Sequence, residues 1–71
     1  MFRVFYGRVF SSESEAKKAE KAVQEYSPVI FPGMASYFIE LGRYKTREQA
    51  DTAYMMFRGR GLRVFIQEIK G

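Results

Sequence analysis

The chain lacks the residues that most small catalytic and metal sites use. Its 71 residues include no cysteine, no histidine and no tryptophan. Without cysteine there is no disulfide framework and no thiol chemistry, and without histidine the usual zinc ligand and the commonest general base are both missing. We therefore expect a protein that is not an enzyme and that needs no metal or cofactor. Phenylalanine and tyrosine, which make up all of the 17% aromatic content, must supply both the core and any binding surface.

Long apolar segments and strong charge are missing as well. No apolar run approaches the ~20 residues of a membrane helix, and the N-terminus has no signal-peptide core. The formal net charge of +4 is a mild bias toward anionic partners and identifies none of them. We expect a single small domain that works at the cell envelope if it belongs to a larger exported protein, and in the cytoplasm if it is a full-length product.

An internal repeat is the most informative feature present. The segments FRVFYGRVF (2–10) and YFIELGRY (37–44) each carry a hydrophobic run that ends in Gly-Arg and a bulky residue. Each is followed by a capping-box pair that predicts a helix start: Ser12 with Glu15, and Thr46 with Gln49. The two copies are about 35 residues apart and occupy the whole chain, so they indicate two βαβ half-repeats (about 2–35 and 36–70) rather than a solenoid.

Hydrophobic periodicity and turn residues predict the order β-α-β-β-α-β. Strands are expected near 2–9, 28–32, 36–44 and 62–69, and helices near 13–26 and 47–58. In the first helix the expected apolar stripe is Ala16, Ala19, Ala22, Val23 and Tyr26. Pro28 and Pro32 make the second strand an edge strand, and Pro32-Gly33 predicts the centre of a type II turn.

Two βαβ halves with right-handed crossovers fit a ferredoxin-like α+β sandwich. Its four strands would form an antiparallel sheet in the order 4-1-3-2, with both helices on one face. The other face would be open, and the alternation of the strands directs seven residues toward it: Arg3, Phe5, Phe38, Glu40, Arg63, Phe65 and Gln67.

Three phenylalanines on an open sheet face are costly unless something covers them. One interpretation is a binding platform, on which flat rings accept sugar or base faces while Arg, Glu and Gln fix the orientation. The other is that the strand alternation is misassigned, or that a second copy or a neighbouring domain covers the patch.

The segment YFIELGRYKTREQADTAYMMFRGRG resembles the second half of a SPOR domain, the sporulation-related peptidoglycan-binding module of bacteria. The residues that match the family pattern are Ile39, Leu41, Gly42, Arg43, Tyr44, Thr46, Glu48, Ala50, Ala53, Gly61 and the strand 63–66. The first half is similar at Val4, Tyr6, Gly7, Ser12 and Ala16, with one extra residue before the helix.

This resemblance implies the same sandwich fold and a function. SPOR domains bind glycan strands stripped of their stem peptides, through the open sheet face, and so locate proteins at the division septum. The chain departs from the family at Phe5, where Gln is usual, and at Glu40, where a basic or polar residue is common. Arg8 and Arg43 stand where small residues often follow the glycines.

Other functions stay open. An RRM has the same strand order and stacks bases on aromatic residues, although the RNP pattern of that family is absent here. A homodimer or other protein–protein module that uses the open face is a further alternative. Glu40 and Glu68 are expected to be solvated rather than a catalytic pair, and Met55 and Met56 are expected to fill the core.

Overall fold

The computed structural model describes residues 1–70 and has the expected element order. The strands are β1 (Phe2–Phe10), β2 (Val29–Gly33), β3 (Ser36–Tyr44) and β4 (Val64–Glu68). The helices are α1 (Glu13–Glu20), which continues into the 3₁₀ helix η1 (Lys21–Tyr26), and α2 (Arg47–Gly59). The last strand is shorter than the expected range of 62–69.

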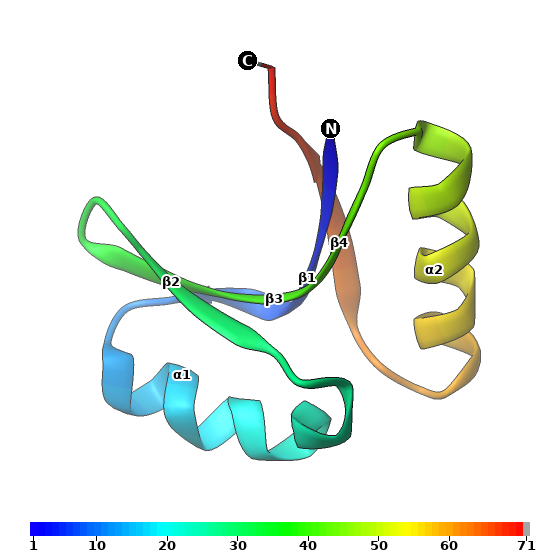
Figure 1. Cartoon of the computed structure of the whole chain (residues 1–71). Coiled ribbons are helices and arrows are strands. Elements are labelled where there is room, and N and C mark those ends of the chain that lie inside the picture. The colour runs from blue at the N-terminus through cyan, green and yellow to red at the C-terminus, as the bar shows by residue number, and fades with distance from the viewer. Residues whose placement is uncertain (71) are drawn as a thin grey trace.

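The four strands form one antiparallel sheet in the order β2-β3-β1-β4. This is the expected order read from the opposite edge. The repeated strands β1 and β3 pair at the centre, and β2 lies at an edge, as its prolines predict. The sheet is strongly bent, so that α1 and α2 lie along its convex side and its other side is concave (Figure 1).

Alternate side chains of the strands meet the two helices in a core of two clusters. One, under α2, is formed by Val4, Ala53, Phe57 and Val64. The other, under α1 and η1, is formed by Phe10, Ala16, Val23 and Ile39. The strand residues Val4, Ile39 and Val64, which alternate with those directed to the open face, therefore point toward the helices. Neither helix among residues 1–70 is long and apolar enough to span a membrane.

Both predicted helix caps are confirmed. The hydroxyl of Ser12 accepts a hydrogen bond from the backbone N–H of Glu15, and that of Thr46 accepts one from Gln49, each at 3.2 Å. These bonds satisfy N–H groups that a helix start otherwise leaves without a partner. The end of α2 also depends on residues close in sequence. Gly61 has a left-handed backbone (φ 82°), which lets the N–H of Leu62 donate to the carbonyl of Phe57 at 3.0 Å.

The predicted helix over 13–26 is present, but it is not a single α-helix. It changes to 3₁₀ winding after Glu20, and Val23 departs from helical backbone angles (φ −125°, ψ 18°). Because a 3₁₀ helix has 3.0 residues per turn rather than 3.6, the apolar stripe does not continue in register. Val23 is buried as expected, but Ala22 is exposed.

The predicted turn at Pro32-Gly33 is also wrong. These two residues pair with Tyr37 and Ser36 and belong to β2, so the loop is Met34-Ala35. Ala35 supplies the left-handed backbone that reverses the chain (φ 58°). The shift adds two residue pairs to the ladder and so pairs backbone groups that a turn at 32–33 would leave free.

Candidate functional site

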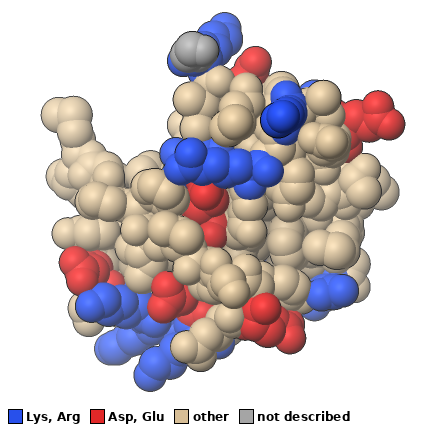
Figure 2. Space-filling view, in the orientation of Figure 1, with Lys and Arg blue, Asp and Glu red and all other residues tan. Residues whose placement is uncertain are grey.

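Within residues 1–70 no helix lies over the concave side of the sheet, and we call this side the open face (Figure 1). Figure 2 shows that charged side chains of both signs gather over α1, along the lower edge of that view, while much of the remaining visible surface is uncharged. The open face is the place to test the residues that strand alternation predicted.

A row of four phenylalanines crosses the open face from edge to edge. Phe31 of β2 is paired with Phe38 of β3. The ring of Phe5 on β1 lies 5.4 Å from that of Phe38 and 5.3 Å from that of Phe65 on β4, centroid to centroid. These are favourable distances for tilted aromatic pairs. We call Phe31, Phe38, Phe5 and Phe65 the aromatic row.

The members of the row differ in accessibility. Phe5 lies on the open face as predicted, but only 1% of its surface is exposed, because Phe38 and Phe65 flank it and the guanidinium of Arg3 lies 4.8 Å from its ring centroid. Phe31, Phe38 and Phe65 are partly exposed. A ligand can therefore stack on these three rings, whereas Phe5 is inaccessible and packs between Phe38 and Phe65.

A β-bulge decides which polar residues join the row. Val4 pairs with Gly42 and Phe5 with Glu40, so Leu41 has no partner in β1. The extra residue reverses the alternation of β3 beyond it. As a result Arg43 is paired with Arg3 and shares the open face with it, while Leu41 packs against the core.

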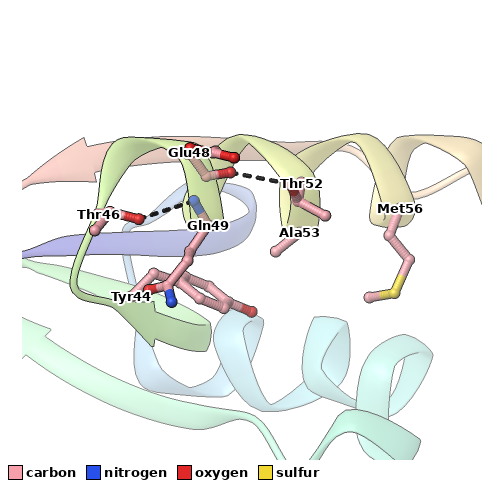
Figure 3. Close-up of a pocket in the computed structure, with 7 residues that line it drawn as sticks. All are labelled: Tyr44, Thr46, Glu48, Gln49, Thr52, Ala53 and Met56. Carbon is pink, nitrogen blue, oxygen red and sulfur yellow. Dashed lines mark hydrogen bonds between the residues drawn. The ribbon is translucent and has the colours of Figure 1, made fainter.

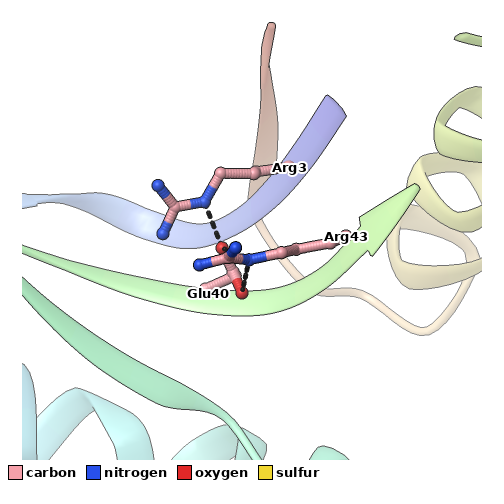
Figure 4. A network of polar contacts seen from close by, with 3 residues as sticks. All are labelled: Arg3, Glu40 and Arg43. Carbon is pink, nitrogen blue, oxygen red and sulfur yellow. Dashed lines mark hydrogen bonds and ion pairs between the residues drawn. The ribbon is translucent and has the colours of Figure 1, made fainter. Parts of the chain in front are cut away.

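Arg3, Glu40 and Arg43 form a compact ionic group, which we call the trio (Figure 4). The Nε of Arg3 donates to Glu40 Oε2, and the Nε of Arg43 donates to both carboxylate oxygens, at 3.0 and 3.2 Å. The Glu40 side chain is only 8% exposed. The expectation that Glu40 is solvated is therefore wrong, because Arg3 of β1 and Arg43 of β3 place their guanidinium groups against its carboxylate.

The trio lies against the β2 end of the aromatic row. The guanidinium carbon of Arg3 is 4.2 Å from the centroid of Phe31, and that of Arg43 is 5.3 Å from it. Both are within the range of cation–π attraction. The predicted site does not include Arg43 or Phe31. Strict alternation directs Arg43 to the open face only if the bulge at Leu41 is known. Phe31 reaches this face through its pairing with Phe38.

The two remaining predicted residues lie differently. Gln67 is paired with Arg3 and exposed, so it joins the edge of the open face. Arg63 precedes β4, and its carbonyl accepts a hydrogen bond from Gly7 N–H at 2.7 Å. Its side chain borders a shallow groove with Arg8 and Phe10, and no residue of the aromatic row lines this groove. The structure thus brings six of the seven predicted residues together.

A second groove lies on the helix side (Figure 3). It is lined by Tyr44, Thr46, Glu48, Gln49, Thr52, Ala53 and Met56. Its polar groups are already used by α2: Thr46 caps the helix, Thr52 donates to the carbonyl of Glu48, and Gln49 accepts from Lys45 N–H. These hydrogen bonds are all local to the start of α2, so we do not assign the groove a ligand.

The expectation that Met55 and Met56 fill the core is wrong. Met55 is 72% exposed and Met56 43%, whereas Phe57 is buried. Successive helical residues point about 100° apart, so only one of the three can face the sheet.

We do not assign a ligand to the charged surface of α1 either. Lys17 forms an i,i+4 ion pair with Glu13 at 2.9 Å, and this hydrogen bond and charge raise the pKa of Lys17 above its ordinary value. Within residues 1–70 no group of three or more Asp and Glu side chains is placed to hold a metal ion.

Comparison with known proteins adds no relative to this description. No protein-family model, curated protein or solved structure matches the chain. The family and the function therefore remain proposals that rest on the residues and the geometry of the open face.

Proposed function

We propose that this chain is a non-catalytic SPOR-type module with a ferredoxin-like sandwich fold, and that its open face binds the glycan strands of bacterial peptidoglycan from which the stem peptides have been removed. The observation that carries the proposal is the aromatic row on a concave sheet face that no helix covers. Localisation at the cell envelope and a role in cell division or sporulation belong to the same proposal.

The chemistry of the open face suits a sugar polymer. Sugar rings have apolar C–H faces that pack on aromatic rings, and hydroxyl groups that need hydrogen-bond partners at their rims. Phe31, Phe38 and Phe65 offer partly exposed rings on three strands. With strands roughly 4.8 Å apart, the row extends about 14 Å across the sheet, which is long enough for a short oligosaccharide. Gln67 and Arg43 stand at its sides with exposed polar ends.

Nucleic acid is less well supported. Base stacking of the RRM kind uses exposed rings on the two central strands. On β1 the ring that would serve is Phe5, which is buried. The carboxylate of Glu40 also lies at the centre of the face, where it neutralises part of the charge that phosphates would need.

Self-association is the second candidate. The partly exposed rings of the open face would also be covered if two copies packed face to face. The two candidates differ in one measurable property, because a homodimer forms without added glycan and dissociates on dilution.

The test is binding to purified sacculi, either untreated or partly digested with an amidase, so that many stem peptides are removed while enough cross-links remain to keep the sacculi insoluble. We expect the wild type to pellet with the digested sacculi more than with the untreated ones. Phe38→Ala should weaken this binding by about fivefold, since one stacking ring contributes roughly 1 kcal/mol. Met55→Ala and Lys18→Ala, on the exposed sides of α2 and α1, are the matched controls and should bind like the wild type.

Two outcomes contradict parts of the proposal. If the wild type binds neither preparation, the glycan function is wrong, and sedimentation analysis of wild type and Phe38→Asp then tests the dimer. If the wild type binds but folded Phe38→Ala binds equally well, the module function stands and the open face is not the site. Thermal unfolding of each variant shows whether it is folded.

A further inference from the structure

The hydrogen bonds of the trio use only part of the donors that two arginines offer. A guanidinium is planar and has five N–H donors, which lie along its edges and can meet a planar acceptor such as a carboxylate. Arg3 and Arg43 both approach Glu40 through Nε. Within residues 1–70, no hydrogen bond engages the terminal Nη nitrogens of either residue. Figure 4 shows these nitrogens at the ends of both side chains, beyond the Nε atoms that meet Glu40.

One of these donors is shielded from solvent. The Nη2 of Arg3 is buried and has no acceptor among the described residues. A buried donor without a partner is unfavourable, more so when the group is charged. The Arg3 side chain is 15% exposed and that of Arg43 48%, so a ligand would meet Arg43 first and Arg3 behind it.

The charges of the trio also do not balance. Two guanidinium groups face one carboxylate, which leaves one positive charge on a partly dehydrated part of the open face. A single additional carboxylate would neutralise it. A phosphate with a charge near −2 would overcompensate, so the charge balance favours a carboxylate.

The position of the trio fits a ligand that lies on the aromatic row. Both guanidinium groups are within 5.3 Å of the centroid of Phe31, the ring at the β2 end of the row. A sugar stacked near Phe31 would therefore hold a substituent of its ring beside the Nη groups.

We infer that the Nη groups of Arg43 and Arg3 form a carboxylate subsite next to Phe31. This inference rests on the proposed glycan function and adds which group of the glycan strand is recognised, namely a carboxylate. Hydrolysis of the amide that joins a stem peptide to the lactyl group of its sugar leaves a carboxylate on that sugar. The subsite accepts this group as a charge-assisted hydrogen-bond partner and gives the module its preference for stem-free glycan.

The experiment compares three soluble strands by isothermal titration calorimetry. These are stem-free glycan strands released from sacculi by complete amidase digestion, the same strands with the lactyl carboxylates converted to neutral amides, and chitin oligosaccharides, which have a similar backbone and no carboxylate. We expect the wild type to bind the first about tenfold more tightly than the other two. Arg43→Gln should lose this preference and bind the neutral strands within about twofold of the wild type.

The controls and outcomes distinguish the carboxylate subsite from the proposed glycan binding. Lys18→Gln removes the same charge from α1, on the helix side, and should keep the tenfold preference. If the wild type binds carboxylated and neutral strands equally, the subsite is wrong while glycan binding stands. If Arg43→Gln and Lys18→Gln lower the preference equally, general charge and not the subsite is responsible, which also overturns it. If no strand binds, the proposed function fails and the subsite with it.

Discussion

Replacing Glu40 by Gln should destabilise the fold through the two arginines that it leaves behind. The carboxylate is almost fully buried and is the acceptor for Nε of both Arg3 and Arg43. Removing one partner of a buried ion pair costs about 3 to 5 kcal/mol, because the other charge is left buried without compensation. Here the cost is reduced, since Arg43 is half exposed and the amide oxygen of Gln can still accept one bond.

We therefore expect Glu40→Gln to lower the free energy of unfolding by about 2 kcal/mol. In a domain of this length that lowers Tm by roughly 8 to 16 °C. A urea titration at pH 7, followed by far-ultraviolet circular dichroism, should show a midpoint about 2 M lower with an unchanged slope. The control is Glu68→Gln, the same chemical change at an exposed position of β4, which should stay within about 0.5 kcal/mol of the wild type.

An unchanged midpoint for Glu40→Gln would refute the assignment of a buried Glu40 carboxylate that both arginines need. A triple variant tests the reasoning about charge: Arg3→Met, Glu40→Leu and Arg43→Met together leave no buried ion. Its stability should be close to that of the wild type, because apolar residues of similar volume can replace a buried ionic group at little cost. A loss as large as that of Glu40→Gln would show that packing, and not an uncompensated charge, explains the single variant.

Three further predictions concern local features. Ser12→Ala and Thr46→Ala should each lower the free energy of unfolding by about 1 kcal/mol, and denaturant midpoints equal to wild type would show that neither cap matters. Gly61→Ala should lose about 1 kcal/mol because of its left-handed backbone, whereas Gly59→Ala, which is helical with open space around an added Cβ, should gain up to about 1 kcal/mol; opposite signs in a thermal melt are the test. Phe5→Ala should lose about 3 to 5 kcal/mol as a core-like truncation, and a stable variant that only weakens glycan binding would mean that the ring is accessible after all.

The features that the sequence predicts correctly depend on neighbours in the chain. A capping hydroxyl meets an N–H three residues later, and the left-handed backbone of Gly61 lets the chain close the last turn of α2. Ser12, Thr46 and Gly61 could therefore be assigned without tertiary information. The alternation of β1 and β4 likewise separates core from open face, because successive strand residues point to opposite sides.

The errors arise where distant residues decide the local geometry. The 3₁₀ winding of η1 turns Val23 into the cluster under β3, and ladder pairing with β3 moves the hairpin loop from 32–33 to Met34-Ala35. The exposure of Met55 and Met56 follows from the side of α2 that faces the sheet. Each depends on packing against another element rather than on residue preference alone.

For the candidate site, the sequence by itself determined that phenylalanines and charged residues would share one face of a four-stranded sheet, since that follows from a period of two. Only the tertiary structure decided what each of them can do there. The bulge at Leu41 places Arg43 beside Arg3, and together they bury Glu40. Cross-strand contacts bury Phe5 and leave Phe31, Phe38 and Phe65 partly exposed. Accessibility and pairing are properties of neighbouring strands, which strand register and bulges bring together and which no single segment encodes.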